Sequence, residues 1–311
     1  MKILVLGARG FVGRHVMEAV ATARWEPVAG VRRQARRDPA AITLDACDTA
    51  ALSAALVGID AVVNCVAGNP ETIVRNALAL AAAAARTPVH VIHLSSMAVY
   101  GAATGLVGEQ AELRDDIGGY ASAKIAAERA FDGLAGVTIL RPGCIYGAGS
   151  VQWTRRIARL LIQRRIGDLG VAGDGCANLV HIRDAVAAIV AVVRAGPAAP
   201  RIVNLAMPDT PDWNDYFIRF GRAIGAVPVR RVPTWQLTLD VKLLAPPLKI
   251  AELIAARLSC PRLAAPPIPP SLARLWRQDI RLDSALATMR LGLVWTSLDE
   301  GLAEAAGDCR C

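Results

Sequence analysis

The first thirteen residues place the strongest constraint on the fold of this chain. Residues 2–7 form a short apolar run of strand-forming residues, typical of a strand buried on both faces of a sheet. Gly7, Gly10 and Gly13 follow, and a helical pattern of apolar residues begins at Phe11. Glycines at these positions permit a tight turn, close approach to a pyrophosphate and close helix packing. The segment therefore predicts a dinucleotide site with phosphates at a helix N-terminus.

Strands and helices alternate through the first half of the chain, which predicts a doubly wound parallel sheet of the Rossmann type. We expect strands at 2–7, 27–31, 42–44, 61–65, 89–95, 137–141, 178–181 and 202–205. From residue 207 onward proline is frequent and helices dominate, as at 213–224 and 243–258, so a smaller helical domain is expected. We assign residues 1–150 with 178–206 to the dinucleotide domain, and 151–177 with 207–311 to a substrate-binding lid.

Composition excludes several classes of protein. The net charge of +8 permits acidic partners, but the arginines are scattered and form no aromatic-studded basic stripe, so no nucleic-acid partner is expected. No apolar run reaches the roughly 18 residues of a membrane span. The seven cysteines lack zinc-type spacing, so no metal site is expected. Because the first strand begins at residue 2, we expect no cleaved leader and a cytoplasmic, reduced protein.

Tyr120 and Lys124 lie four residues apart in a predicted helix and therefore share one of its faces. An ammonium beside a phenol favours the phenolate, so we expect Lys124 to lower the pKa of Tyr120 toward neutrality. A group that exchanges a proton near pH 7 suits the interconversion of a carbonyl and an alcohol. Lys2, Lys124, Lys242 and Lys249 are the only lysines of the chain, which makes this pairing informative.

The end of the second predicted strand indicates which dinucleotide binds. An acidic residue there holds the adenosine ribose of NAD, whereas an arginine suits the 2′-phosphate of NADP. The chain has Arg32 and Arg33 at this place and no acidic residue before Asp38. Arg9, inside the glycine turn, points to the same neighbourhood, and an arginine gives a phosphate charge-assisted hydrogen bonds. We therefore expect NADP(H) rather than NAD(H).

Taken together, these motifs resemble the extended short-chain dehydrogenases/reductases, the NAD-dependent epimerase/dehydratase family. The resemblance covers nearly the whole chain. Besides the glycine turn, it rests on Leu94–Gly101, Tyr120-x-x-x-Lys124, Arg141–Gly147 and Val180–Asp184.

The resemblance implies roles for particular residues. Ser96, Tyr120 and Lys124 would be catalytic: Ser96 would hydrogen-bond to the substrate oxygen, Tyr120 would carry the proton, and Lys124 would also hold the nicotinamide ribose. The implied cofactor-binding residues are Gly7, Arg9, Gly10, Phe11, Val12, Gly13, Arg32, Arg33, Asp45, Ala46, Val66, Ala67, Gly68, Tyr120, Lys124, Pro142, Gly143, Cys144 and Ile145. The implied substrate contacts are Met97, Cys144 and Trp153. A homodimer that pairs through the Tyr120 helix is also implied.

Two departures from the family pattern bear on the substrate. Enzymes of the nucleotide-sugar branch commonly have Asn where this chain has Cys144, and a basic residue where it has 176–178. Together with the apolar region at 243–258, this favours an NADP(H)-dependent ketone reductase or alcohol dehydrogenase for a small lipophilic substrate, as in dihydroflavonol-reductase-like and 3β-hydroxysteroid-dehydrogenase-like members. The alternatives are a nucleotide-sugar epimerase, dehydratase or reductase, with phosphate held by Arg155, Arg156 and Arg159, and a non-catalytic dinucleotide sensor.

Overall fold

A computed structural model describes residues 1–32, 41–257 and 265–309 of the chain. At its centre is a seven-stranded sheet in which all neighbouring strands are parallel. The order β3-β2-β1-β4-β5-β7-β10 places the topological switch point between β1 and β4, as in dinucleotide-binding folds. Its strands are β1 (Lys2–Leu6), β2 (Glu26–Val31), β3 (Ala41–Thr43), β4 (Ala61–Asn64), β5 (His90–Leu94), β7 (Val137–Pro142) and β10 (Ile202–Leu205). The predicted α/β class with a Rossmann-type sheet is confirmed.

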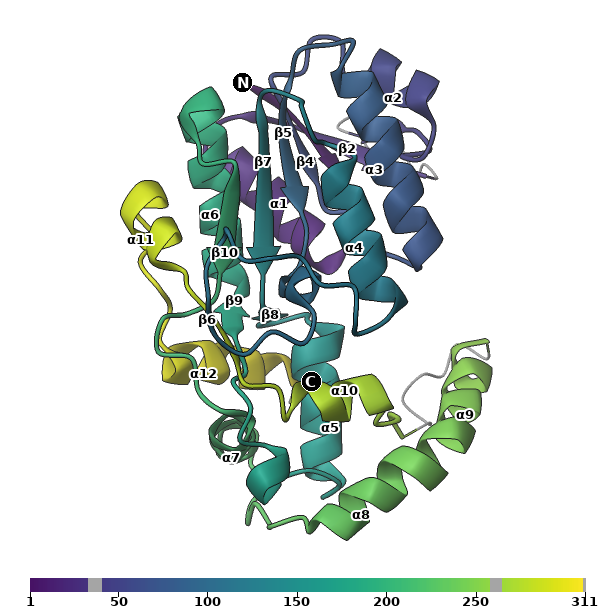
Figure 1. The fold of residues 1–311 in the computed structure, drawn as a ribbon, viewed down its shortest axis with the longest axis vertical. Helices are drawn as coiled ribbons and strands as arrows, with labels where there is room; N and C mark the ends of the chain where they lie inside the picture. The colour runs from purple at the N-terminus through teal and green to yellow at the C-terminus, as the bar shows by residue number, and fades with distance from the viewer. Residues whose placement is uncertain (33–40, 258–264, 310–311) are drawn as a thin grey trace.

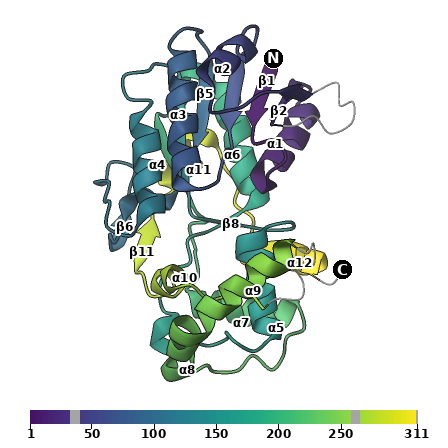
Figure 2. The same ribbon diagram turned by 90° about the vertical axis from the view of Figure 1, so that its right-hand side faces the viewer.

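Helices cover both faces of this sheet (Figures 1 and 2). One apolar core joins the sheet to α1 (Phe11–Thr22), α6 (Ile182–Ala195) and α11 (Ala285–Leu291). The opposite core joins it to α2 (Thr49–Ala55), α3 (Pro70–Ala84) and α4 (Gly119–Arg129). The buried strands fit this arrangement, because a parallel sheet covered on both sides has to present apolar side chains to both layers.

Helix α3 illustrates how the sequence sets the start of an element. Asn69 is its N-cap and its side chain accepts a hydrogen bond from the Thr72 amide at 2.8 Å, while Pro70 occupies the first helical position. Both residues are favoured there, because the cap satisfies an unpaired N–H and proline has no N–H to leave unpaired. The helix therefore begins at Pro70.

The smaller domain below the carboxyl edge of the sheet is mostly helical, as predicted (Figure 1). Its core is rich in aromatic side chains, including Trp213, Tyr216, Phe217, Phe220 and Trp276, all fully buried. Its helices are α5 (Arg156–Ile162), α7 (Trp213–Ala223), α8 (Thr234–Leu239), α9 (Ala245–Arg257), α10 (Pro270–Leu275) and α12 (Leu298–Cys309). Two π-helical stretches, η2 (Val151–Arg155) and η5 (Asp240–Leu244), precede α5 and α9.

Two further parallel sheets have only two strands each. One pairs β6 (Gly105–Val107) with β11 (Ile280–Leu282), and the other pairs β8 (Cys144–Tyr146) with β9 (Leu179–His181). The predicted strand at 178–181 therefore lies outside the main sheet. Near the C-terminus the chain returns to the large domain, where Ala287 and Leu293 pack in the same core as Val203 and Ile189.

Two predictions about partners can be compared with this fold. No helix among the described residues is both long and apolar enough to cross a membrane. In α4, Ala121, Ala123 and Ala127 are buried within the chain, so these small residues pack against its own core. The predicted homodimer stays a prediction.

Candidate active site

The predicted site residues gather at one edge of the main sheet. Because all its strands are parallel, the segments that follow β1, β2, β3, β4, β5 and β7 emerge at the carboxyl edge. These segments contain the glycine turn, Arg32, Asp45 with Ala46, Val66–Gly68, Ser96 and Gly143. Arg33 lies outside the described residues. The fold therefore brings these residues together at one edge of the sheet, although they are spread over more than a hundred positions of the sequence.

The turn between β1 and α1 has the geometry that a dinucleotide requires. Gly7 adopts a φ of 75°, which side chains rarely permit, and a Cβ on Gly13 would lie 2.2 Å from the Gly7 carbonyl oxygen. Helix α1 has Gly10 as its N-cap, and its fully described first turn has neither a side-chain cap nor an acidic residue. The N–H groups of Phe11, Val12 and Gly13 thus begin a helix whose dipole favours an anion, so the turn fits a pyrophosphate.

Ser96 and Tyr120 come together from different elements. Ser96 follows β5, and its hydroxyl oxygen accepts a hydrogen bond from the Ala98 amide at 3.2 Å, which caps a 3₁₀ turn at Met97–Tyr100. Tyr120 lies in the first turn of α4 with 48% of its surface exposed. The Ser96 hydroxyl lies near enough to the Tyr120 phenol to affect the Tyr120 pKa. The two hydroxyl groups predicted to contact the substrate oxygen are therefore adjacent.

Lys124 lies one turn further along α4 and is buried, with 4% of its surface exposed. Its Nζ donates a hydrogen bond to the Leu94 carbonyl oxygen at 2.7 Å. Burial lowers the pKa of Lys124 to about 8, although the carboxylate of Glu128 opposes this shift. The ammonium thus lies at the end of β5, next to the element that supplies Ser96.

The direction of the Tyr120 pKa differs from the prediction. Although 48% of the residue's surface is exposed, loss of water around the phenolic oxygen raises the Tyr120 pKa above its usual value, and the nearby Ser96 hydroxyl only partly opposes this. The Lys124 ammonium is directed at the Leu94 carbonyl instead of the phenol. The predicted lowering of the Tyr120 pKa is wrong for the chain alone, because helical spacing places two residues on one face without aiming one at the other.

Residues expected around the adenosine end occupy the edge beyond β2 and β3. Arg32 is exposed directly after β2, and Arg9 is exposed in the glycine turn. Asp45 is exposed after β3, where its carboxylate accepts a hydrogen bond from the Cys47 amide at 3.0 Å. Ala46 is held by Asn76, whose side-chain amide donates to the Ala46 carbonyl at 2.7 Å.

Asn76 belongs to a buried polar chain that the sequence analysis missed. Asn64, at the end of β4, donates to the Asn76 side-chain oxygen at 2.8 Å and lies 3.2 Å from Nδ1 of His93. Burial, with a contribution from Lys124, holds the pKa of His93 well below its usual range, so this imidazole is neutral. These hydrogen-bonded side chains thus connect the Ala46 loop to the surroundings of Lys124. The polar residue Asn64 within an otherwise apolar strand was the available signal.

A second buried network fixes α4 against the sheet. Arg141 on β7 donates from Nε to Glu128 Oε1 at 3.0 Å and from Nη2 to Oε2 at 2.6 Å. Its Nη1 also donates to the Tyr100 hydroxyl at 2.9 Å, which in turn donates to Asn204 at 2.6 Å. Arg141 and Glu128 are 2% and 4% exposed. Glu128 lies four residues after Lys124, on the same face of α4.

The expected substrate contacts line the junction of the two domains. Met97 and Cys144 are buried in the core that continues into the smaller domain. Trp153 is half-buried, with its ring 5.6 Å from that of Trp213. Its carbonyl accepts a hydrogen bond from the Tyr216 hydroxyl at 2.5 Å. The Trp153 ring therefore packs with the aromatic core of the smaller domain.

The positions that departed from the nucleotide-sugar pattern are occupied by internal contacts. Cys144 is 2% exposed, and residues 176–178 are buried. The Asn178 side chain donates to the Ile280 carbonyl at 2.6 Å and accepts from the Leu282 amide at 2.8 Å.

Two of the arginines considered as phosphate ligands already form ion pairs. Arg155 Nη2 lies 2.9 Å from Asp308 Oδ1, and Arg156 Nη2 lies 3.8 Å from Glu252 Oε1.

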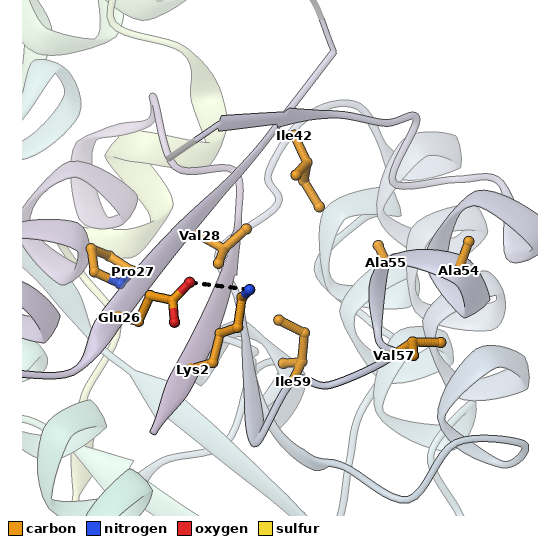
Figure 3. A pocket seen from close by; sticks show the side chains of 9 residues that line it. All are labelled: Lys2, Glu26, Pro27, Val28, Ile42, Ala54, Ala55, Val57 and Ile59. Carbon is orange, nitrogen blue, oxygen red and sulfur yellow. Dashed lines mark ion pairs between the residues drawn. The ribbon is translucent and has the colours of Figure 1, made fainter. Parts of the chain in front are cut away.

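A surface hollow of about 550 Å³ lies at the opposite, amino edge of the sheet (Figure 3). An ion pair between Lys2 and Glu26, with an N–O distance of 3.1 Å, lies at this hollow. The remaining lining is aliphatic, namely Pro27, Val28, Ile42, Ala54, Ala55, Val57 and Ile59. This hollow contains none of the predicted site residues and lies far from the strand ends that carry them.

The family of the chain is established by its match to a family model. Residues 3–206 match the model described as the NAD dependent epimerase/dehydratase family, and the chain belongs to that family. The predicted resemblance is thereby confirmed. No curated protein sequence matches the chain at a significant level.

Solved structures with similar folds include several enzymes that act on nucleotide sugars. UDP-N-acetylglucosamine 4-epimerase from Bacillus cereus has a TM-score of 0.73 at 16% identity, covering all of both chains. UDP-glucuronic acid 4-epimerase from Bacillus cereus, solved with UDP-glucuronic acid and NAD, has a TM-score of 0.72 at 18% identity, covering 100% of this chain and 99% of that one. TunA, an NAD-dependent NDP-hexosamine 5,6-dehydratase of tunicamycin biosynthesis, has a TM-score of 0.72 at 20% identity, covering 99% and 97%.

These comparisons change the order of the functional expectations. They support a dinucleotide-dependent enzyme of the epimerase/dehydratase type. They also favour the nucleotide-sugar alternative over the ketone reductase that the sequence departures had placed first.

Proposed function

We propose that the chain is an NAD(P)-dependent enzyme that oxidises and reduces a secondary carbon–oxygen centre of a nucleotide sugar, using Ser96, Tyr120 and Lys124. The observation that carries the proposal is the proximity of Ser96 and Tyr120, beside the buried Lys124 and at the carboxyl edge of the sheet. Two hydroxyl groups that meet at a dinucleotide-binding edge can hold one substrate oxygen in a fixed position. The family membership and the similar folds support this reaction class.

The roles of the three residues follow from their surroundings. When bound, a nicotinamide cofactor supplies the group that accepts or donates hydride. Tyr120, whose pKa is raised, holds its proton at neutral pH and donates it at the phenolic oxygen when a carbonyl is reduced. The reverse direction requires the Tyr120 phenolate, whose oxygen takes the alcohol proton as the C–H bond breaks and C=O forms. Ser96 orients the same oxygen.

Lys124 and the glycine turn are proposed to position the cofactor. The Lys124 ammonium is available as a donor to ribose hydroxyls, and the N-terminus of α1 receives the pyrophosphate. We further propose that Arg32 favours NADP(H), because it is exposed directly after β2, where an arginine suits a 2′-phosphate.

A second candidate function, reduction of a lipophilic ketone, is supported by one observation. Cys144 and residues 176–178 are buried, and the Asn178 side-chain amide is hydrogen-bonded to the protein backbone. These positions therefore present buried, uncharged groups instead of a charged side chain that could hold a diphosphate. Losing such a clamp would cost a nucleotide sugar several kcal/mol of binding.

Ligand binding separates the two candidates. Thermal stabilisation of the protein should be measured with UDP- and dTDP-sugars and with hydrophobic ketones, in the presence of NAD⁺ or NADP⁺. Stabilisation by nucleotide sugars, followed by detection of the altered sugar by proton NMR, is expected. Stabilisation by ketones alone would reverse the order of the candidates.

Matched variants test the catalytic assignment. We expect Tyr120→Phe and Ser96→Ala to lower kcat by about 10²-fold or more, since each removes a hydroxyl from the substrate oxygen. Ser95→Ala removes a neighbouring buried hydroxyl and should leave turnover within a few-fold of the original. Full turnover by Tyr120→Phe would refute the assignment.

A further inference from the structure

A helical arm begins at the bottom of the smaller domain with α8 and rises beside that domain with α9 (Figure 1). It consists of α8, η5 and α9, which follow one another without interruption from Thr234. Its residues 234–254 span about 30 Å at the usual helical rise. The arm thus forms an extended surface along the side of the smaller domain.

The inner side of the arm is already satisfied by the rest of the chain. Leu237, Asp240 and Ala245 are 2%, 3% and 6% exposed. Arg165 Nε donates to Asp240 Oδ2 at 3.0 Å and Nη1 donates to the Pro266 carbonyl at 2.6 Å, which fixes the arm to the domain. Val241 also packs against the core of the smaller domain.

The outer side of the arm carries an apolar stripe. Its members recur at intervals of three, four or seven residues, so they share one helical face. They are 44–65% exposed, a high value for large apolar side chains in a folded protein. The outer stripe consists of Trp235, Leu239, Leu243, Ile250, Leu253 and Ile254.

The charges beside the outer stripe are positive. Lys242 and Lys249 are both exposed on the arm. The acidic residues among 234–254 are Asp240, which is buried against Arg165, and Glu252, which pairs with Lys249 at 2.6 Å. An apolar face that includes a tryptophan and is accompanied by lysines is the composition of helices that lie in a membrane interface.

We propose that the outer stripe docks on an anionic lipid surface, with the arm lying parallel to the membrane. The apolar side chains would enter the boundary between headgroups and acyl chains, while Lys242 contacts lipid phosphates. A second copy of the chain fits less well, because the same stretch would offer it lysines and no unpaired exposed acid to complement them. This inference is independent of the substrate.

Vesicle flotation of the full chain tests the proposal. We expect binding to vesicles of phosphatidylcholine with phosphatidylglycerol, little binding to phosphatidylcholine alone, and weaker binding at high salt. The double variant Leu243→Glu with Ile250→Glu should bind at least tenfold more weakly. Lys242→Gln should weaken binding by about fivefold, because one lysine near the surface contributes about that factor.

A matched pair of substitutions controls for added charge. Met289→Glu with Val294→Glu introduces two carboxylates at positions that are 74% and 90% exposed outside the arm, and should float as the original protein does. Circular dichroism would verify that both double variants are folded. Absence of flotation, or equal loss in both pairs, would overturn the proposal. So would light scattering that reveals a dimer which only the stripe pair dissociates, since that result assigns the face to a second copy.

Discussion

Replacing Lys124 by Met tests the energetic cost of burying its ammonium. In an unfolded chain this group has a pKa near 10.5, whereas in the folded chain burial lowers it to about 8. Between these values the unfolded state binds more protons than the folded state, so the free energy of unfolding rises with pH. The cost of burial is fully present below pH 8 and disappears above about pH 10.5.

The magnitude follows from the size of this difference. One pKa unit corresponds to about 1.4 kcal/mol, so the cost amounts to about 3 kcal/mol at neutral pH. Met fills a similar volume without a charge and is free of this cost. It also loses the 2.7 Å hydrogen bond to the Leu94 carbonyl, which displaces the whole stability curve without giving it this pH dependence.

Urea unfolding of both proteins across pH 7 to 10 measures the effect, and the difference between the two curves cancels the titration of other groups. The original protein should gain up to about 3 kcal/mol relative to Lys124→Met over this range. Lys242→Met, which changes an exposed lysine, should run parallel to the original. If the free energy of unfolding of Lys124→Met also ran parallel to that of the original protein, the reasoning would be refuted. Lys124 would then have the same pKa in the folded and the unfolded state.

Three further substitutions probe other parts of the fold and site. Glu128→Gln should lower the free energy of unfolding by about 3–5 kcal/mol, because it leaves Arg141 buried without its carboxylate. Urea unfolding measures this, and a change below 1 kcal/mol would contradict it. Gly13→Ala should reduce both the melting temperature and dinucleotide affinity, because its Cβ would lie 2.2 Å from the Gly7 carbonyl oxygen. Unchanged fluorescence titrations with NAD⁺ and NADP⁺ would count against it. Arg32→Asp should raise the KM for NADPH far more than that for NADH, and a native preference for NADH would rule out the assignment.

The large domain could be predicted from the sequence because its signals are local. The strand, turn and helix at residues 2–22 each follow from apolar spacing and from glycines. The strand at Ile202–Leu205 was predicted with its observed bounds. By contrast, β6 was missed, because three residues from Gly105 gain strand geometry only by pairing with Ile280–Leu282, far away in the sequence.

The sequence predicts which residues form the candidate site, but it does not predict the electrostatics that the fold gives them. Motif order identified Ser96, Tyr120 and Lys124, and the fold places Ser96 against Tyr120. The raised Tyr120 pKa depends on burial, which helical spacing does not report. The pairing of Glu128 with Arg141 was missed because charged residues are mostly exposed, and only the fold reveals that these two are buried together.

The return of the chain near its C-terminus has a consequence for how the molecule comes apart. Ala287 and Leu293 pack in the core of the large domain with residues of α6 and β10. The segments just before and after them belong to the smaller domain. The polypeptide thus passes between the two domains several times. A single protease cut between them would release neither as an intact fragment, and heating should melt both in one transition.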